Sequence, residues 1–321
     1  MLAFLKSFSK TNFRIKVSFA ALLAVFTLTP GMSVYENLTP HPQAPPVKTA
    51  GLTLPTPAPY PVAQGELAPA LSAEAAIVID TNSAAVLYEK NADALLLPAS
   101  TTKIMTAFVA LEHYNLTDVI TVTQASSSIG QSMRLVRGET ITVENLLYGL
   151  LVASGNDAAF ALAQSYPGGY TAFVDKMNQK AQELHLTNTT FRNVSGVESY
   201  GHVTTVRDLS ILAREAMKNP TFAQMVATPS ITVRSSDGTI VHNLYTINEL
   251  LGKVEGLKGI KTGWTENAGE CLVTATERNG HEIITVMLGS EDRFDESQRL
   301  IEWAFANVSW ENFELREKPR P

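Results

Sequence analysis

This chain of 321 residues has a single cysteine and none of the common metal-binding or nucleotide-binding motifs, and each absence excludes a kind of site. The single cysteine, Cys271, excludes a disulfide within the chain and any zinc site built from cysteines. The sequence contains no HExxH, no paired CxxC and no Walker-type glycine loop, so we expect neither a metal nor a cofactor. The six histidines lack the spacing of metal ligands, and we expect them to be structural or solvated.

Charge is also scarce, because only 17% of the residues are charged while 45% are hydrophobic. That balance is typical of a globular protein with a substantial core. The net charge of −6, with no basic stripe along the chain, gives no indication of a nucleic-acid partner. The length allows one large domain or two modest ones, and we find no internal repeat.

The first 35 residues have the pattern of a segment that directs a protein to a membrane. Lys6, Lys10, Arg14 and Lys16 precede an uncharged stretch over 17–35, whose apolar heart is 17–28. A basic flank before a short apolar run is typical of a signal peptide, and the uncharged stretch is also just long enough for an N-terminal membrane anchor. A buried helix is the alternative, but it would not explain the basic flank. We therefore expect the body of the protein outside the cytoplasmic membrane, secreted or anchored there by residues 1–35.

Residues 36–70 change to a composition rich in proline, alanine and threonine, which predicts an extended linker. The prolines expected to keep this stretch extended are Pro40, Pro42, Pro45, Pro46, Pro55, Pro57, Pro59 and Pro61. We expect the folded domain to occupy residues 71–308 and residues 309–321 to form a C-terminal tail.

Hydrophobic periodicity within 71–308 predicts an α+β fold. We expect strands at both ends of the domain, over 75–80, 84–89, 231–234, 259–264, 271–277 and 282–288. We expect helices from residue 98 to about 111 and over 144–153, 158–164, 169–184, 206–217 and 295–305. Strands from both ends must meet, so we predict an antiparallel sheet covered by the first and last helices, with an inserted all-helical lobe and a cleft at the seam between them.

Ser100 and Lys103 form the first of three short motifs that suggest catalysis. They lie three residues apart at the start of an apolar helix, so that their side chains share one face. A serine needs a nearby base to act as a nucleophile, and a buried lysine can supply one because burial lowers its pKa. The alternative is a capping serine with a surface lysine, although this helix is too apolar for Lys103 to reach solvent easily.

Ser154 and Asn156 form the second motif, on a glycine-containing turn between two helical runs. Both side chains can face one cavity, where the hydroxyl can pass a proton and the amide can orient a substrate. Taken alone, this triplet is an ordinary helix connection, because serine, glycine and asparagine are common turn residues.

Lys261, Thr262 and Gly263 form the third motif, on a predicted strand that continues to Trp264. Gly263 allows a substrate backbone to lie beside the strand, while the charge of Lys261 and the hydroxyl of Thr262 suit a carboxylate. An ordinary β-turn is the alternative for this motif.

The order and context of the three motifs resemble the active-site serine penicillin-recognising enzymes, which include the serine β-lactamases. Within that group, the stretches 98–107, 154–159, 188–196 and 259–269 look like the low-molecular-mass D-alanyl-D-alanine carboxypeptidases. The resemblance covers about residues 74–305 and implies the β-lactamase/transpeptidase-like fold. Trp264 stands where many members have histidine, and the resemblance ends at the closing helix, without the second β-rich domain of many relatives.

The resemblance also implies roles for these residues. Ser100 would be the nucleophile, Lys103 its base, Ser154 a proton relay and Asn156 an orienting amide. Lys261, Thr262 and Arg293 would hold a terminal carboxylate, beside Gly263, and the backbone N–H groups of Ser100 and Trp264 would form an oxyanion hole.

The function that this resemblance implies is a serine D,D-carboxypeptidase that acts on peptidoglycan stem peptides and is inhibited covalently by β-lactam antibiotics. A D,D-endopeptidase that cuts peptidoglycan cross-links and a non-catalytic β-lactam-binding sensor or scaffold are the alternatives.

Overall fold

The computed structural model describes residues 59–124 and 130–312, which all belong to one compact unit over 57–321. Within these residues no helix is both long and apolar enough to cross a lipid bilayer. The predicted signal or anchor at 1–35 lies outside the described residues, as does the linker up to residue 58.

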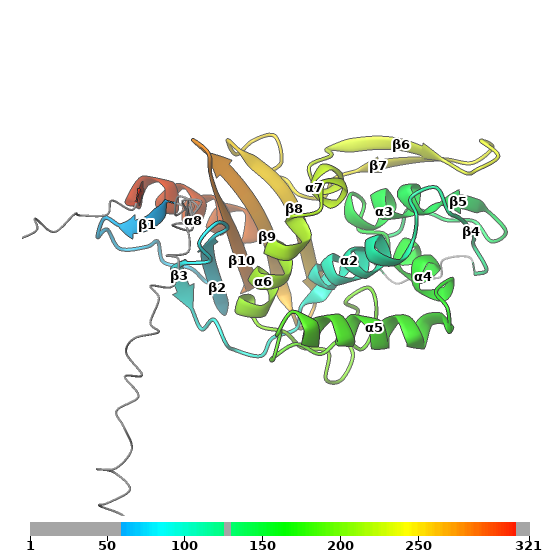
Figure 1. Ribbon diagram of the computed structural model, residues 1–321, viewed down its shortest axis with the longest axis horizontal. Coiled ribbons are helices and arrows are strands. Elements are labelled where there is room, and N and C mark those ends of the chain that lie inside the picture. The colour runs from blue at the N-terminus through cyan, green and yellow to red at the C-terminus, as the bar shows by residue number, and fades with distance from the viewer. Residues whose placement is uncertain (1–58, 125–129, 313–321) are drawn as a thin grey trace, which may run out of the picture. The chain divides into compact units, whose positions relative to one another are not determined.

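A five-stranded antiparallel sheet joins the two ends of this unit (Figure 1). Its strands, in spatial order, are β3 (Val86–Lys90), β2 (Ala75–Asp80), β10 (His281–Ser290), β9 (Gly269–Arg278) and β8 (Leu257–Thr265). All six residues of β2 are buried, which suits a strand that is paired on both sides and covered on both faces. The predicted meeting of N-terminal and C-terminal strands is confirmed.

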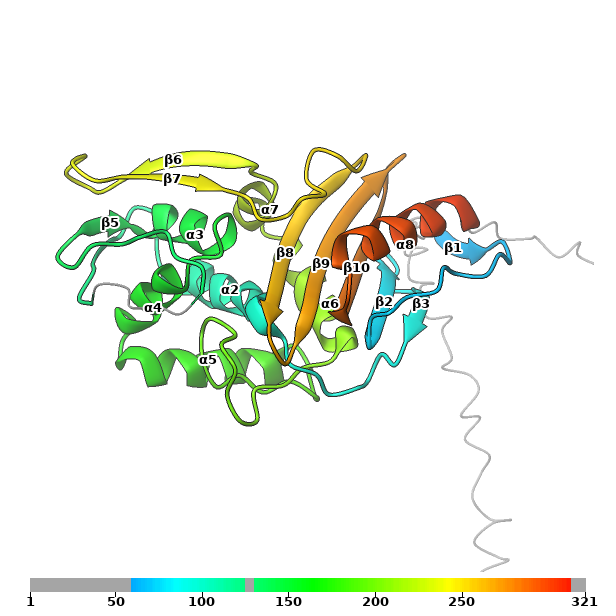
Figure 2. The same cartoon turned by 180° about the vertical axis from the view of Figure 1, so that it is seen from behind.

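Two helices cover opposite faces of the sheet (Figure 2). α8 (Arg293–Asn307) packs on β9 and β10, and α6 (Val206–Met217) packs on β2 and β10 from the other side. The expectation that the first helix covers the sheet is therefore wrong. α2 (Lys103–His113) is apolar on most sides and packs among other helices, whereas α6 has the single apolar stripe that a sheet face needs.

The lobe beside the sheet contains α2 together with α3 (Val143–Leu151), α4 (Asn156–Gln164), α5 (Gly169–Glu183) and α7 (Pro220–Val226). The prediction that this lobe is all-helical is wrong, because two strand pairs lie in the same region. β4 (Val119–Thr121) pairs with β5 (Thr140–Thr142), and β6 (Ser230–Arg234) pairs with β7 (Val241–Tyr245). The short runs of valine, isoleucine and threonine in these strands favour extended structure.

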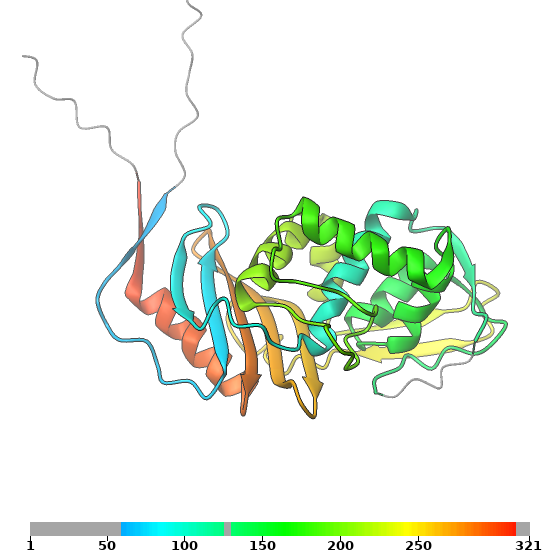
Figure 3. The same cartoon turned by 90° about the horizontal axis from the view of Figure 1, so that it is seen from below.

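A further strand pair extends the fold beyond the boundaries expected from the sequence (Figure 3). β1 (Tyr60–Ala63) falls in the expected linker, and β11 (Val308–Glu311) runs into the expected tail, yet the two pair antiparallel. Proline is tolerated in β1 because it is an edge strand. Trp310 anchors this ribbon, since its ring stacks on His281 at 4.5 Å and its indole Nε1 donates to Asp80 Oδ1 at 2.8 Å.

Candidate active site

Ser100 and Lys103 lie where the sheet meets the lobe. A short 3₁₀ helix, η1 (Ala99–Thr102), carries Ser100 and leads directly into α2, whose first residue is Lys103. η1 packs against β8 and β9, so this turn is held between the sheet and the lobe. The Lys103 ammonium nitrogen Nζ lies 2.7 Å from Ser100 Oγ, which confirms that the two side chains share one face.

The surroundings of Lys103 favour its neutral form. The side chain is fully buried, and its Nζ also donates to the Ser195 carbonyl oxygen at 2.9 Å. Burial and the nearby charge of Lys261 hold the pKa of Lys103 well below its usual value, and the carboxylate of Asp157 offsets part of that shift. A neutral amine at hydrogen-bond distance from a hydroxyl can act as its base.

Ser154 and Asn156 occupy the turn between α3 and α4. Ser154 is buried and has a positive φ of 56°, an uncommon conformation for a serine. Asn156 begins α4, and both residues line the same cavity as Ser100. The turn between the two helices therefore forms part of the cavity wall.

β8 forms the opposite wall of the cavity. Gly263 lies so close to η1 that a Cβ atom there would be 3.0 Å from both Ala99 Cβ and the backbone nitrogen of Ser100. This close approach explains why the strand has glycine at that position, because a side chain would push away the turn that carries Ser100. Trp264 follows at the rim, with 62% of its surface exposed.

Two cations stand on the β8 side of the cavity. Lys261 is buried and its Nζ donates to the Thr262 carbonyl oxygen at 2.8 Å, while the Arg293 guanidinium donates to the Gly263 carbonyl oxygen at 2.9 Å. Burial, with a contribution from the positive charge of Arg293, lowers the pKa of Lys261 to about 7. The Arg293 Nε–H is buried and has no acceptor among the residues that the structure describes.

The cavity between these walls has a volume of about 440 Å³. Ser100, Ser154, Asn156, Thr262, Gly263, Trp264 and Arg293 all line it. Lys103 and Lys261 lie behind that lining, where each contacts a lining residue or its backbone. The structure thus brings together every residue that the sequence nominated for the site.

Other residues of the site were not nominated from the sequence. The Ser195 carbonyl accepts from Lys103, and Gly196, Val197 and Glu198 continue the cavity wall from this loop. Glu198 accepts a hydrogen bond from the backbone N–H of Asn267 at 3.0 Å, which joins the loop to the turn after β8. The stretch 188–196 carried part of the family resemblance, but a backbone carbonyl leaves no trace in a sequence.

The histidines and the cysteine that the structure describes stand outside this chemistry. His202 is buried, accepts from the Arg192 N–H at 3.1 Å and contacts Thr102 Oγ1 at 2.9 Å; burial lowers its pKa to about 4, so it is neutral. Cys271 is fully buried in β9, and burial raises the pKa of its thiol to about 11. Among the described residues no histidine, cysteine, aspartate or glutamate cluster could hold a metal ion.

Comparison with known proteins agrees with this geometry. Residues 62–292 match the D-alanyl-D-alanine carboxypeptidase family. The chain is 33% identical over 243 residues to the D-alanyl-D-alanine carboxypeptidase DacF of Bacillus subtilis, and the match covers 73% of this chain and 62% of DacF. It is 34% identical over 258 residues to a D-alanyl-D-alanine carboxypeptidase of Streptomyces sp. strain K15, covering 74% of this chain and 89% of that enzyme.

Solved structures agree in fold. The crystal structure of the Streptomyces K15 DD-transpeptidase has a TM-score of 0.69 and 32% identity, and the match covers 75% of this chain and all of that one. Penicillin-binding protein D2 from Listeria monocytogenes, in an ampicillin-bound form, has a TM-score of 0.65 and 32% identity, covering 73% of this chain and 98% of that one. The predicted fold class is therefore confirmed.

Proposed function

The chain belongs to the D-alanyl-D-alanine carboxypeptidase family, and from that premise we propose that it removes the terminal D-alanine from peptidoglycan stem pentapeptides. The reaction is a hydrolysis that passes through an acyl-enzyme on Ser100. The single observation that carries this proposal is the 2.7 Å contact between Ser100 Oγ and the Nζ of a fully buried Lys103. This is the geometry of a nucleophile with its base.

Acylation begins when Ser100 Oγ attacks the carbonyl carbon of the penultimate D-alanine. The Ser100 proton passes to the neutral Lys103 amine, which keeps one N–H on the Ser195 carbonyl while its lone pair faces the hydroxyl. The negative charge that develops on the carbonyl oxygen is stabilised by the backbone N–H groups of Ser100 and Trp264. The closeness of Gly263 to the Ser100 backbone nitrogen supports this arrangement.

The C–N bond then breaks, and the leaving amino group of D-alanine takes the proton held by Lys103 through the Ser154 hydroxyl, so that Lys103 is neutral again. The Asn156 amide orients the substrate backbone beside this hydroxyl. A water molecule next attacks the Ser100 ester and gives up a proton to the neutral Lys103 amine, and the shortened peptide is released. Ser100 recovers its proton, so the enzyme is regenerated.

The terminal carboxylate of the substrate is held on the β8 side of the cavity. Lys261 and Arg293 supply positive charge there, and Thr262 supplies a hydroxyl donor. The buried Nε–H of Arg293, which has no acceptor among the described residues, supports an anionic ligand at this position. A carboxypeptidase needs such a subsite because its substrate ends in a free carboxylate.

The enzyme acts outside the cytoplasmic membrane, where peptidoglycan is assembled. Residues 1–35 direct the chain there as a signal peptide or hold it there as an N-terminal anchor. Residues 36–58 form the linker between this segment and the catalytic domain. β-Lactam antibiotics acylate Ser100 as covalent inhibitors, and the ampicillin-bound form of the Listeria relative supports this expectation.

The test is D-alanine release from a peptide ending in Lys-D-Ala-D-Ala. The full chain is compared with Ser100→Ala, and with Ser199→Ala as a control at an exposed serine. We expect release by the wild type and the control, and none by Ser100→Ala. Release that survives in Ser100→Ala would reject Ser100 as the nucleophile.

A D,D-endopeptidase is the second candidate, because the chain is also 35% identical over 240 residues to a D-alanyl-D-alanine endopeptidase of Pseudomonas aeruginosa. The same residues would cut the peptide bond of a cross-link instead of a terminal one. Cross-linked muropeptides separate the two activities. Cleavage of these without D-alanine release from the linear peptide would favour the endopeptidase, and penicillin acylation without turnover of either substrate would favour a sensor.

A further inference from the structure

A short stretch of chain, the cleft-wall segment (residues 130–135), forms the side of the cavity next to Asn156. Gly130 and Gln131 line the cavity, and the Gln131 carbonyl oxygen accepts from the Asn156 backbone N–H at 2.8 Å. A Cβ atom on Gly130 would lie 3.1 Å from the side-chain amide nitrogen Nδ2 of Asn156. The position of this segment therefore determines where Asn156 stands.

The carboxylate of Asp157 accepts hydrogen bonds from the rest of the cleft-wall segment. Asp157 accepts from the Ser132 hydroxyl at 2.7 Å and from the backbone N–H groups of Met133 and Leu135, each at 3.0 Å. Because Asp157 directly follows Asn156 on α4, these bonds tie the segment to the second catalytic motif.

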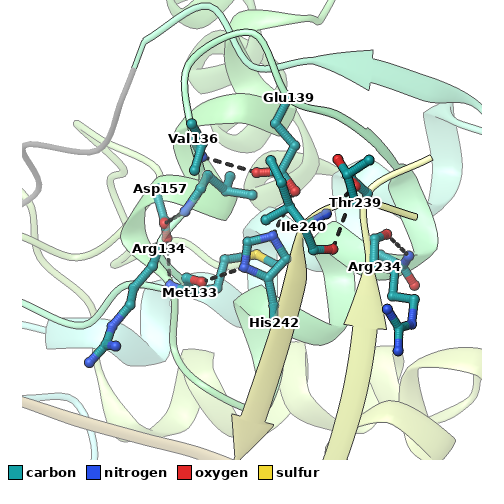
Figure 4. A network of polar contacts seen from close by, with 12 residues as sticks. Met133, Arg134, Val136, Glu139, Asp157, Arg234, Thr239, Ile240 and His242 are labelled. Carbon is teal, nitrogen blue, oxygen red and sulfur yellow. Dashed lines mark hydrogen bonds and ion pairs between the residues drawn. The ribbon is translucent and has the colours of Figure 1, made fainter. Parts of the chain in front are cut away.

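A buried histidine holds the segment from the other side (Figure 4). His242, on β7, contacts the Met133 carbonyl oxygen through Nδ1 at 2.9 Å and Glu139 Oε1 through Nε2 at 2.6 Å. Glu139 in turn accepts from the Val136 N–H at 3.0 Å. The side chains of His242 and Glu139 are only 3% and 0% exposed, so neither contact is replaced by solvent.

The chemistry of these groups fixes where the hydrogen atoms are. A carbonyl oxygen can only accept, so the Nδ1 of His242 carries a proton toward Met133. The contact between Nε2 and Glu139 then needs one further proton, which either partner can carry. Removing the Glu139 carboxyl would leave Nε2 of His242 buried without a partner, which is costly, and would also take away the acceptor of the Val136 N–H.

We propose that Glu139 and His242 are positioning residues of the catalytic site. Through Met133 they hold the cleft-wall segment against Asp157, and through Gln131 the segment holds Asn156 at the cavity. Neither residue touches the substrate, Ser100 or Lys103. This inference rests on the proposed function for its kinetic readout, whereas its structural readout is independent of any activity.

The test compares Glu139→Ala with Glu139→Gln in the full chain. Glutamine can accept from Val136 with its oxygen and donate to Nε2 with its amide, so we expect it to behave like the wild type. Alanine cannot, and we expect amide hydrogen exchange at Met133 and Leu135 to become at least about tenfold faster. We expect kcat/KM for D-alanine release to fall about tenfold, while the midpoint of its acid limb, which Lys103 sets, stays unchanged.

Two further variants keep the test decisive. His242→Asn is the milder change if Glu139→Ala does not fold, because it loses the contact with Glu139 but retains a donor for Met133. His281→Asn is the control, since that histidine stacks on Trp310 and lies outside the cavity lining.

The outcomes separate the two proposals. A folded Glu139→Ala or His242→Asn protein with wild-type exchange in 130–135 would overturn the positioning role, as would faster exchange with wild-type kcat/KM. A wild-type protein that neither releases D-alanine nor reacts with penicillin would instead defeat the proposed function. The exchange experiment would then decide the structural claim by itself.

Discussion

The two walls of the cavity bury their charges in different ways. On the lobe wall each buried carboxylate has donors around it, since Asp157 accepts from three groups of the cleft-wall segment and Glu139 contacts His242. On the β8 wall two cations, Lys261 and Arg293, stand near one another, and they donate to backbone carbonyl groups. The Glu270 carboxylate accepts from the backbone N–H of Arg293 at 2.9 Å, and its other oxygen lies 3.8 Å from the Arg293 guanidinium, a long ion pair without a hydrogen bond between the two side chains.

This contrast suggests that the walls have different tasks. A buried carboxylate that accepts several hydrogen bonds from the protein holds its surroundings in place, whereas the positive charge of Arg293 lowers the pKa of the neighbouring Lys261 and the pair favours an anionic ligand. We therefore expect removal of a charge to affect stability on the lobe wall and substrate use on the β8 wall. The following predictions test that division, in order of decreasing effect.

Lys261→Met should lower kcat/KM for D-alanine release by about 10³-fold, or ~4 kcal/mol, because the substrate carboxylate loses a buried cation. The Tm at pH 7 should not fall, since a buried ammonium group that is partly neutral at this pH contributes little to folding. Lys258→Met, on the same strand but paired with Glu277 and Glu282, is the control and should keep wild-type kinetics. A lower Tm with unchanged kcat/KM would contradict this division, because it would show that Lys261 serves stability rather than substrate binding.

Asp157→Ala should lower the free energy of unfolding by about 3 kcal/mol, because three donors lose a charged acceptor. Urea unfolding measures this change, with Asp175→Ala at an exposed site on α5 as the control. A loss below about 0.5 kcal/mol, the size expected at a surface position, would show that the lobe wall does not depend on this carboxylate.

Binding of a carboxylate substrate should draw a proton onto Lys261. With a pKa of about 7 the free side chain is mostly neutral at pH 8, and a bound carboxylate raises that pKa. If the pKa rises by about two units, the uptake at pH 8 is about 0.8 proton per site. Calorimetry of Lys-D-Ala-D-Ala peptide binding to Ser100→Ala, in two buffers of different ionisation enthalpy, measures this number.

Arginine at position 261 stays charged at this pH. The Ser100→Ala, Lys261→Arg double variant should therefore take up no proton at position 261 when the peptide binds. Equal uptake by both proteins would assign the proton to another group and weaken the account of the β8 wall.

Trp264→His should have the smallest effect. The side chain is largely exposed at the rim, so the free energy of unfolding should change by less than about 0.5 kcal/mol. KM should rise about threefold, because part of an apolar contact with the substrate is lost while the backbone N–H remains. A hundredfold loss of kcat would show instead that the indole fixes the position of that N–H.

The sequence predicted the parts of the site that depend on local order. Ser100 and Lys103 are one helical turn apart, Ser154 and Asn156 flank one glycine, and Lys261 to Trp264 are consecutive on a strand. Such spacings fix which side chains share a face whatever the rest of the chain does. Their convergence followed from the need for strands at both ends of the domain to pair.

The remaining features depend on contacts between distant segments. Glu139 and His242 are separated by 103 positions, and β1 pairs with β11 across most of the described chain. Neither partner has a periodic pattern that points to the other. His242 was expected to be structural or solvated, and the structure shows that it is structural, but only the folded arrangement identifies what it holds.

Cys271 has a practical consequence for handling the protein. It is the single thiol of the sequence, it is fully buried, and its pKa of about 11 keeps it protonated at neutral pH. Thiol-reactive dyes should therefore leave the native protein unlabelled. A cysteine introduced at the exposed Gln131 would be the one site that such a dye modifies. Its fluorescence would then follow the cavity wall in real time in a protein that carries a single substitution.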